Sequence, residues 1–367
     1  MKITLNYAGN GDCILVESGN TRILFDGGTA ASYSKWKENV NRFRDLDCLV
    51  VTHFDSDHTN GIIKLLESNQ KPIINNILFN SANEVLELED CLCGVIEDIE
   101  VDALSSRLAS LPDEDFNIGF SEGTSLSYLI RNQNIKSNKK AITSDVYNSI
   151  NVGEISMQVI SPSMKTLKKL KNQWFEVLND EGVKRKILTK SHSLAFENYL
   201  RSLKEDNFEE ITANTYLDVD TLAEFIYKKD SSLANESSLA FLLQNGKSSI
   251  LMLGDCHAED VLTWLDKKNI KELKVDAVKL SHHGSKHNIN KELVKRLNCG
   301  MYLVSTNGEV FKHPDLETLA LLAKYSINKK VKIMINNPIK HVTKNVVKTF
   351  LDYNGTEIIL NVKEFNL

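Results

Sequence analysis

The sequence predicts an α/β protein in which strands and helices pack in layers. Two observations support this fold class. Short apolar runs alternate with helix-like segments over residues 1–80, and they do so again from about residue 236 to the end of the sequence. In both stretches, clusters of polar side chains directly follow the apolar runs, which is where the active sites of layered α/β folds collect.

The first stretch reads as strands around a turn, followed by a helix and a buried strand. ITLNY and CILVE flank the turn at residues 8–12, and RILFD ends in Asp26-Gly27-Gly28. SKWKENVNRF then has the pattern of a polar helix. CLVVTHFD is a continuous apolar run, which is typical of a buried strand, and the next helix begins near Gly61.

The second stretch begins with a predicted hairpin. SLAFLL and SSILMLGD flank the turn at residues 244–247. The segments EDVLTWLDKK, NKELVKRL and LETLALLAKY have helical patterns, and they alternate with the strand-like runs VDAVKLS and MYLVST. Further strands are expected at the end of the chain.

The middle of the chain is less regular. Residues 81–111 have a helical period with one apolar and one acidic face, and residues 112–150 show little periodicity. Residues 155–160 alternate like a strand, whereas residues 163–230 are charged and mostly helical in pattern.

The charge of the chain is unevenly distributed. The 367 residues have a net charge of −5, which is not the charge of a typical nucleic-acid-binding protein. Residues 81–120 carry a net charge of −10, however, and residues 131–191 carry +7. The basic stretch is either an anion-binding surface or a solvated helix face.

The sequence contains no membrane signal. No run approaches the roughly 18 apolar residues that a membrane span needs. The first residues, MKITLNYAGNGD, lack the apolar region of a signal peptide. We therefore expect a cytoplasmic protein without a membrane partner.

Residues 52–58, THFDSDH, carry four side chains that can bind a metal ion, directly after the buried strand. His53, Asp55 and Asp57 are two residues apart, so on a strand or tight loop they point the same way, while His58 turns toward a second point close by. Four ligands for two adjacent ions is what a dinuclear hydrolytic site requires. The alternative is a polar loop that caps the next helix through Asp57, but a cap needs only one side chain.

Further polar residues follow other predicted strands. Asp255 is either a metal ligand or the cap of the next helix. His282 and His283 are both ligands, or one of them is a hydrogen-bonded neighbour of a ligand. His313 is either functional or structural. Lys279 lies near the end of a buried strand, where a lysine needs an anionic partner unless it reaches solvent.

Together these motifs resemble the metallo-β-lactamase superfamily, whose signature is HxHxDH after a strand. Within it, the sequence resembles the hydrolase domain of ComEC-type competence proteins and its free-standing relatives. The motifs occur in the family's order. They are Gly9-Asn10-Gly11-Asp12, Leu24-Phe25-Asp26-Gly27-Gly28, THFDSDH, Ser161-Pro162, Asn235-Glu236-Ser237-Ser238, Leu253-Gly254-Asp255, KLSHHGS from Lys279 to Ser285, and Lys312-His313-Pro314.

The resemblance implies a four-layer αββα sandwich with two similar halves and a metal site at one edge. Residues 1–367 would form a single domain with its core in residues 1–80 and 231–367. Residues 81–150 and 163–230 would be largely helical insertions between the two halves.

The resemblance also implies two divalent metal ions, bridged by Asp255. One ion would be held by His53, Asp55 and Asp255. The other would be held by Asp57, His58, Asp255 and either His282 or His283. Asp26 would orient a ligand histidine, and the supporting residues behind the ligands would further include Asp12, Asn235 and Ser238.

Two positions depart from the family pattern. The second histidine of HxHxDH is Asp55 here, and the only histidine between residues 59 and 235 is His192, which lies in the second insertion. The first site is therefore rich in oxygen donors, which suit manganese or magnesium better than zinc. Zinc, manganese and magnesium all remain candidates.

The predicted function is metal-dependent hydrolysis of a phosphodiester, most of all in nucleic acid. Two close cations polarise phosphoryl oxygens and lower the pKa of a water molecule. Asp57 would orient that water or act as its base, and Lys279 and His313 would contact the phosphate or protonate the leaving group. The basic residues 131–191 would bind the nucleic acid.

Two other functions remain open. The same chemistry could act on a small phosphoester, a cyclic nucleotide or a lactone, in which case the basic stretch would lie far from the metals. Alternatively, the chain is a metal-stabilised subunit whose acidic helix at residues 85–111 binds a protein partner. The resemblance to free-standing relatives suggests a phage-defence system for such a subunit, by analogy alone.

Overall fold

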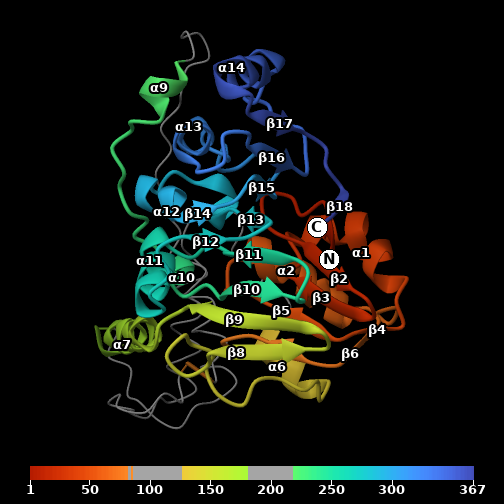
Figure 1. Ribbon diagram of the computed structural model, residues 1–367. Helices are drawn as coiled ribbons and strands as arrows, with labels where there is room; N and C mark the ends of the chain where they lie inside the picture. The colour runs from red at the N-terminus through yellow and green to blue at the C-terminus, as the bar shows by residue number, and fades with distance from the viewer. Residues whose placement is uncertain (82–83, 86–125, 181–217) are drawn as a thin grey trace.

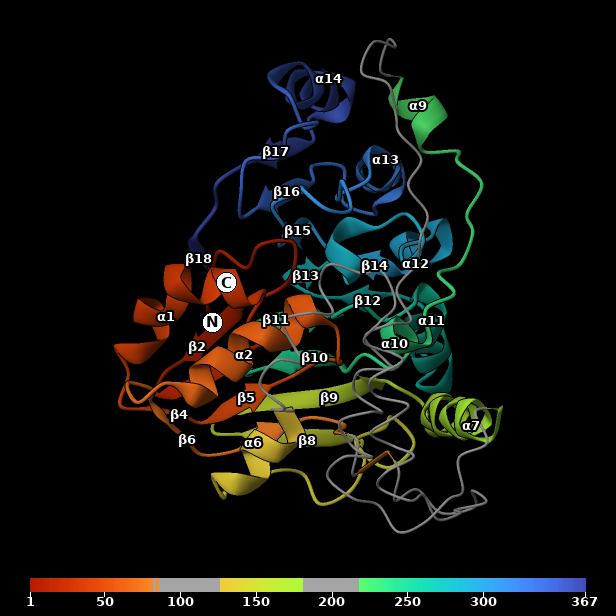
Figure 2. The same ribbon diagram turned by 180° about the vertical axis from the view of Figure 1, so that it is seen from behind.

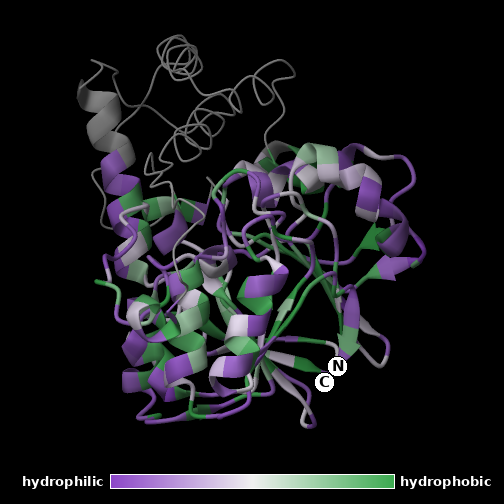
Figure 3. Ribbon diagram, turned by 90° about the horizontal axis from the view of Figure 1, so that it is seen from above, coloured by the Kyte–Doolittle hydropathy of each residue, from purple (hydrophilic) through white to green (hydrophobic). Residues whose placement is uncertain are grey.

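Two large sheets form the centre of the molecule, and helices cover their outer sides (Figure 1). The computed structural model describes residues 1–81, 84–85, 126–180 and 218–367. Seen from above, the apolar strands run through the middle, and the outer helices carry both polar and apolar residues (Figure 3).

The first sheet has six strands in the order β18-β1-β2-β3-β5-β7. In that order they span Glu364–Asn366, Lys2–Leu5, Ile14–Ser18, Thr21–Phe25, Cys48–Val50 and Ile77–Leu78. The strands β1, β2 and β3 are antiparallel neighbours, whereas β5 and β7 run parallel to β3. The last strand of the chain, β18, returns to pair with β1, so the two termini lie side by side.

The second sheet has eight strands in the order β17-β16-β15-β13-β11-β10-β9-β8. In that order they span Glu357–Ile359, Lys332–Ile335, Met301–Val304, Ala277–Lys279, Ser249–Met252, Ala240–Gln244, Ile155–Ser161 and Ser149–Val152. The predicted hairpin is the antiparallel pair of β10 and β11. From β11 to β17 all neighbours are parallel, so their carboxyl ends lie at one edge of the sheet.

Two short two-stranded sheets flank these large ones. One pairs β4 (Asp45–Leu46) with β6 (Ile73–Ile74), and the other pairs β12 (Leu273–Lys274) with β14 (Leu297–Asn298).

The helices lie in two outer layers, with α1 on the opposite side of the molecule from α11 and α12 (Figures 1 and 2). The layer over the first sheet contains η1 (Ala30–Ser32), α1 (Tyr33–Asn41), α2 (Ser56–Glu67) and α6 (Leu126–Asn132). The layer over the second sheet contains α11 (Ala258–Lys267), α12 (Lys291–Arg296), α13 (Leu316–Tyr325) and α14 (Lys344–Asn354). Shorter or peripheral elements are α7 (Met164–Asp180), α9 (Val219–Leu222), α10 (Leu233–Glu236) and η2 (Ser281–Gly284).

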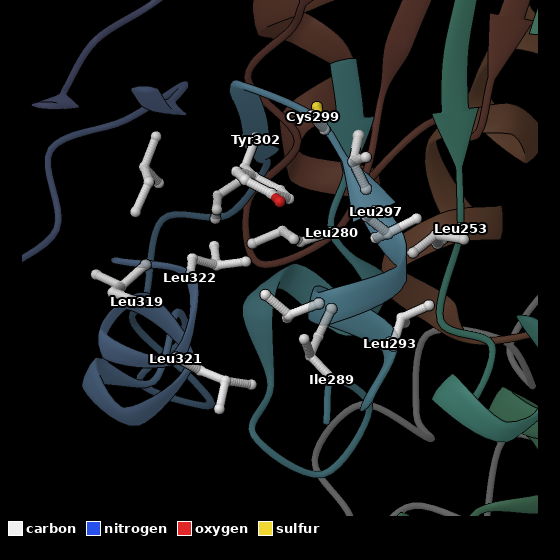
Figure 4. Close-up of a cluster of buried hydrophobic side chains, with 14 of the residues drawn as sticks. Leu253, Leu280, Ile289, Leu293, Leu297, Cys299, Tyr302, Leu319, Leu321 and Leu322 are labelled. Carbon is white, nitrogen blue, oxygen red and sulfur yellow. The ribbon is translucent and has the colours of Figure 1, made fainter. Parts of the chain in front are cut away.

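The alternation of side chains along the strands explains the layers. Phe25 of β3 points between the sheets and meets Phe241 of β10 edge to face, with ring centroids 6.3 Å apart. Its neighbour Leu24 points the other way and packs with the helices outside the first sheet. On the far side, leucines of α12 and α13 pack with Leu280 and Tyr302 beside the second sheet (Figure 4). The predicted αββα sandwich is therefore confirmed.

Glycines allow α2 to lie directly against the end of β3. Gly27 N donates a hydrogen bond to the carbonyl of His58 at 2.9 Å, and Gly61 N donates to the carbonyl of Gly28 at 2.9 Å. A Cβ on Gly61 would lie 1.9 Å from Gly27 O, and a Cβ on Gly11 would lie 1.6 Å from the carbonyl oxygen of Asp57. The glycines of the sequence motifs thus bring the backbone close to the predicted metal-binding segment.

The middle of the chain contains elements that the sequence did not predict. The helix α6 is short and lies in a stretch with little periodicity, and β8 begins at Ser149, just before the predicted strand that is β9. The acidic helix expected at residues 85–111 lies outside the described residues apart from Val85, as do residues 181–217. The insertion boundaries stay predictions. No described helix is long and apolar enough to cross a membrane.

We predict that Gly61→Ala destabilises the protein although alanine favours helices by up to about 1 kcal/mol over glycine. The new methyl group would overlap Gly27 O, and such overpacking costs roughly 1–3 kcal/mol or more. Urea unfolding would measure the loss. Gly300→Ala is the matched control, because its Cβ would meet only Lys330 O at 3.8 Å. Equal stability of the two variants would contradict the close approach.

Candidate metal centre

The segment THFDSDH joins β5 to the first turn of α2. Asp55 directly precedes the helix, but its side chain makes no capping hydrogen bond. Asp57 lies inside the first helical turn, and its Oδ2 accepts a hydrogen bond from Asn10 Nδ2 at 2.7 Å. The alternative in which Asp57 is the cap of this helix is therefore wrong.

Asp26, directly after β3, fixes this segment from behind. Its Oδ1 accepts a hydrogen bond from the Thr52 backbone N, and its Oδ2 accepts one from Thr52 Oγ1, both at 2.8 Å. The same Oδ2 lies 2.9 Å from Nδ1 of His58. Asp26 adopts a left-handed φ of 55°, which is rare outside glycine and is tolerated here by this set of contacts. Asp26 thus contacts the Nδ1 side of His58, which is one of the predicted ligands.

The adjacent residues His282 and His283 are also held through their Nδ1 atoms. Nδ1 of His283 donates to the carbonyl oxygen of Ser305 at 2.8 Å, and Nδ1 of His282 lies 3.0 Å from Asn288 Oδ1. Both histidines have positive φ, 45° and 54°, in the turn after β13. This turn lets two successive side chains face the same region with their Nε2 atoms.

The ring of His53 has equivalent support. Its Nδ1 lies 3.1 Å from Thr52 Oγ1 and 3.3 Å from Ser238 Oγ. Ser238 Oγ also accepts a hydrogen bond from the Asp255 backbone N at 3.0 Å. Ser238 therefore connects one predicted ligand to the other, in the supporting position expected for it.

Asp255 places its carboxylate at the meeting point of all four histidines. Its Oδ2 lies 3.4 Å from Nε2 of His58, 3.7 Å from Nε2 of both His53 and His283, and 4.0 Å from Nε2 of His282. Asp255 is buried, with 2% of its surface exposed. Nitrogen and oxygen donors thus converge on a small buried volume.

Several of these donor atoms have no hydrogen-bond partner. Among the described side chains, buried atoms without one include Nε2 of His53, His58 and His283, and Oδ1 of Asp55 and Asp255. Buried polar atoms normally have partners, so such a cluster needs an explanation. Imidazole nitrogens and carboxylate oxygens are ligands of divalent transition metals. The residues present therefore fit metal ions.

The donors form four overlapping groups, two of which contain Asp12. Ligand atoms of Asp57, His58 and His283 lie within 4.8 Å of one another, and so do those of His53, His58 and Asp255. Asp55 Oδ2 lies 3.5 Å from Nε2 of His53. The structure thus brings together all the ligands that were predicted. Of the two adjacent histidines, His283 is the one in the group with Asp57.

Carboxylates dominate the electrostatics of the centre. Burial alone would lower the pKa of His58, but Asp255 and Asp26 raise it well above its usual value. Burial alone would raise the pKa of Asp255, but His58, His283 and His282 lower it well below its usual range. Protons and metal ions therefore compete for these imidazoles, and metal binding is expected to release protons.

Lys279 and Asp12 form a buried ion pair beside the predicted ligands. The Lys279 side chain is fully buried and contacts Asp12, and its Nζ also lies 3.4 Å from the carbonyl oxygen of Gly254. Asp12 Oδ1 lies 3.3 Å from Nδ1 of His283. Burial alone would raise the pKa of Asp12, but Lys279 and His283 hold it below its usual range. Asp12 thus lies on the Nδ1 side of His283, one of the two histidines that the sequence offered as ligands.

His313 lies beside the donors rather than among them. Its ring centroid is 5.1 Å from that of His282, and its Nδ1 lies 3.4 Å from Asp315 Oδ2. Burial lowers the pKa of His313 despite the nearby Asp315, so the ring is neutral at pH 7. His313 can contact a molecule at the centre, but its position does not mark it as a ligand.

Asp230 and Asn288 are candidate functional residues that the sequence reasoning missed. Asp230 Oδ2 accepts hydrogen bonds from Asn235 Nδ2 at 2.7 Å and from Asn288 Nδ2 at 2.9 Å, and it lies 3.6 Å from Nδ1 of His282. Asp230 ends the stretch assigned to the second insertion and has no motif around it. Asn288, three residues after KLSHHGS, could have been found by that proximity.

A family model and a curated relative match parts of this chain. Residues 6–78 match the model of the metallo-beta-lactamase superfamily. A stretch of 125 residues, 34% of this chain, is 29% identical to ComE operon protein 3 of Bacillus subtilis (strain 168). That stretch covers only 16% of the relative's length.

Solved structures with a similar course of the chain share little sequence with it. The metallo-beta-lactamase fold protein YhfI from Bacillus subtilis is 11% identical, with a TM-score of 0.41 over 99% of this chain and 97% of that one. Zn²⁺-bound PqqB from Methylobacterium extorquens is 10% identical, with a TM-score of 0.40 over 100% of both chains. The short form of human tRNase Z is 10% identical, with a TM-score of 0.36 over 100% of this chain and 99% of that one.

The superfamily match includes the segment with Asp26-Gly27-Gly28 and the segment THFDSDH, and the two-sheet sandwich extends over the rest of the described chain. Over residues 6–78 the chain therefore matches the metallo-beta-lactamase superfamily, and its described residues bring together buried histidine and aspartate groups that could hold metal ions.

Proposed function

We propose that the chain is a metal-dependent phosphodiesterase that acts on nucleic acid. The observation that carries the proposal is the convergence of four imidazole Nε2 atoms on Asp255 Oδ2, with Asp55 and Asp57 beside them. This donor set suits two divalent ions, zinc or manganese, with magnesium a weaker candidate because of the imidazoles. Two such ions would polarise a phosphoryl oxygen and lower the pKa of a water molecule.

Asp57 is the residue that we propose to orient the attacking water. Its Oδ2 accepts a hydrogen bond from Asn10 Nδ2 and lies 3.9 Å from Nε2 of His283. Asn10 thereby fixes one carboxylate oxygen, while the carboxylate as a whole faces the centre. An oriented carboxylate can accept a hydrogen bond from the water and then its proton. His313, with a neutral ring next to His282, is positioned to contact a substrate oxygen.

Lys279 has a different role in this proposal from the one that the sequence suggested. Its ammonium contacts Asp12 and is fully buried, so it faces the interior rather than a substrate. Because Asp12 in turn contacts His283, we propose that Lys279 is a positioning residue. The buried ammonium also offsets part of the negative charge of the carboxylates around it.

The position of α7 supports nucleic acid over a small substrate. This helix begins the most basic part of residues 131–191 and lies beside α10 (Figure 2). Lys169 of α7 pairs with Glu236 of α10 at 3.4 Å, and the preceding residue, Asn235, lies 3.4 Å from Nδ1 of His282. The short helix α10 thus lies between the basic helix α7 and the proposed metal centre. A bound polymer strand could contact both α7 and the centre.

Asp57→Ala is expected to abolish phosphodiester hydrolysis while the protein stays folded. The substitution removes both a ligand and the group that orients the water, and such a loss costs on the order of two decades or more in rate. The assay would use a nucleic-acid substrate with Mn²⁺ and with Zn²⁺, alongside thermal unfolding. Glu67→Ala, at the far end of the same helix, is the control and should retain activity. Full activity of Asp57→Ala would refute the mechanism.

Replacing Lys165, Lys168 and Lys169 by glutamine should impair cleavage of long nucleic acid more than cleavage of a small chromogenic phosphodiester. Only a polymer is long enough to reach α7. Each lost phosphate contact should reduce the slope of the log binding constant against the log salt concentration by about 0.7–0.9. The control replaces Lys329, Lys330 and Lys332, at the opposite edge of the second sheet. Equal loss on both substrates would favour the small-substrate function instead.

Lys279→Met is expected to destabilise the metal-free protein by roughly 3–5 kcal/mol, because it leaves the Asp12 carboxylate buried without its cation. Urea unfolding in the presence of a chelator would measure this. The double variant Lys279→Met with Asp12→Asn should recover part of the loss, since no unpaired charge remains. If the double variant is as unstable as the sum of the single variants, the two residues are not coupled.

A further inference from the structure

The proposed metal centre lies at an edge where several strands of the second sheet end. Asp255 follows β11, His283 follows β13, and Ser305, which holds His283, follows β15. The next strand, β16, runs parallel to these three, so its carboxyl end lies at the same edge. Residues 336–343 follow β16 there and have no role in the proposed reaction. Their position makes them part of the surroundings of the centre.

Hydrogen bonds fix this segment against the loop that carries His313. Asn336 Oδ1 accepts a hydrogen bond from the Thr306 backbone N at 3.0 Å. Nε2 of His341 donates to the carbonyl oxygen of Pro314, the residue after His313, at 2.9 Å. The ring of His313 in turn lies beside the predicted ligands. The segment after β16 is therefore a fixed neighbour of the centre.

The chain around this segment is strongly basic. Residues 318–351 contain seven lysines and no aspartate or glutamate, and all of them belong to the described part of the chain. Residues 131–191 carry the same net charge of +7, but they spread it over almost twice the length. A basic stretch that the sequence reasoning did not single out thus adjoins the proposed metal centre.

Four lysines near the centre have no acidic partner among the described side chains. Lys312 directly precedes His313, and Lys340 lies in the segment after β16. By contrast, Lys324 of the same basic stretch pairs with Asp220 at 2.8 Å. The four lysines are all exposed, so their ammonium groups are available to an external anion. They are Lys312, Lys340, Lys344 and Lys348.

The stability of α14 does not account for its lysines. Lys344 and Lys348 lie one turn apart, so their like charges repel each other on one face of the helix. Lys344 also lies in the first turn, which has no acidic residue, and the positive end of a helix disfavours a cation there. An anion that contacts both lysines would remove this repulsion.

The order of the strands places these lysines and α7 on opposite sides of the metal centre. From β11 and β13, the sheet continues through β10 to β9 in one direction and through β15 to β16 in the other. The strand β9 runs in the same direction as β11, since both are antiparallel to β10, so its carboxyl end also lies at the edge of the centre. There β9 leads into α7 and β16 leads into α14. The two helices accordingly lie at opposite ends of the molecule (Figures 1 and 2).

The distance between the two basic helices fits a polymer. At ~4.8 Å between neighbouring strands, β9 and β16 are roughly 24 Å apart, which is about seven nucleotides at ~3.4 Å along one strand of a duplex. A small phosphoester at the centre would reach neither helix. A nucleic-acid strand that contacts α7 and crosses the centre would continue past Lys312 and Lys340 toward α14.

We propose that Lys312, Lys340, Lys344 and Lys348 form a second nucleic-acid-binding surface, on the side of the metal centre opposite to α7. This α14 surface contacts the phosphate backbone, so the bound strand passes over the centre and the scissile phosphate is internal rather than terminal. Ammonium groups contact phosphates whatever the sequence, so the surface positions the strand and does not select its bases. This inference rests on the proposed function.

The test compares two triple variants of the full chain. In the first, glutamine replaces Lys340, Lys344 and Lys348. The control loses the same charge at the amino end of β16, through glutamine in place of Lys329, Lys330 and Lys332. Binding of a fluorescein-labelled single strand longer than the span between α7 and α14 is measured with a chelator present, which prevents cleavage, over a series of salt concentrations.

The first variant should bind the strand at least ~10-fold more weakly at low salt, because three phosphate contacts are lost. The slope of the log binding constant against the log salt concentration should fall by about two. The control should bind as the wild type does, and thermal unfolding should show that both variants are folded. Unchanged binding by the first variant, or equal weakening in both, would overturn the inference.

Two further measurements test the path of the strand and the kind of anion. Wild type should cut circular single-stranded DNA, which has no ends, as well as a linear strand of the same sequence. If only the linear strand is cut, the strand enters by its end and the inference is overturned. Vesicles of phosphatidylserine and phosphatidylcholine test a membrane surface. If the first variant loses binding to these vesicles but keeps binding to nucleic acid, the lysines face lipid and the inference also fails.

The outcomes distinguish this inference from the proposed function. If the wild type binds nucleic acid through the α14 surface but hydrolyses no phosphodiester with Mn²⁺ or Zn²⁺, the proposed function fails and the binding surface stands. If the wild type hydrolyses nucleic acid and the first variant binds it equally well, the proposed function stands and the inference fails. A wild-type protein that neither binds nor cleaves nucleic acid would overturn both.

Discussion

The constraint on which the site depends is the meeting of four imidazole nitrogens and the carboxylate of Asp255 in a buried space. Such a cluster is unfavourable without a cation, because lone pairs and negative charges face one another where water cannot solvate them. The surrounding structure keeps it assembled through the opposite side of each ring. Asp26, Ser305, Asn288 and the pair of hydroxyls at His53 fix the Nδ1 atoms. The Nε2 atom of each of these histidines therefore faces the centre and can bind a metal ion.

This arrangement explains why both halves of the fold are needed. The first sheet supplies the predicted ligands between β5 and α2, and the second sheet supplies those after β11 and β13. Contacts also connect the two halves of the fold. Lys279 of the second sheet pairs with Asp12 of the first half, and Ser305 Oγ donates a hydrogen bond to the carbonyl oxygen of Gly11 at 3.0 Å. A shift of one sheet against the other would separate the ligand groups. Bound metal ions would therefore be expected to stabilise the packing of the two sheets.

The sequence was most informative where residues that act together are neighbours in the chain. THFDSDH and the adjacent His282 and His283 show their donors directly, and the glycine motifs mark where backbones touch. Asp230 could not be found in this way, because its partners follow it by five and by more than fifty residues and no periodicity connects them. The anionic partner of Lys279 could not be identified from the sequence either. A buried lysine predicts that an anion exists, but only the fold identifies it as Asp12.

Distance along the chain also explains why the sequence alone suggested few nitrogen ligands beside His53. Sequence motifs are compared with a family in their order along the chain. A position without the family's histidine is therefore interpreted as a missing ligand. In space, however, a site needs a donor at the right point, whichever strand supplies it. The positive φ values of His282 and His283 let one turn direct two rings toward Asp255. That turn therefore brings two imidazoles to Asp255, and imidazole nitrogen suits zinc as well as manganese.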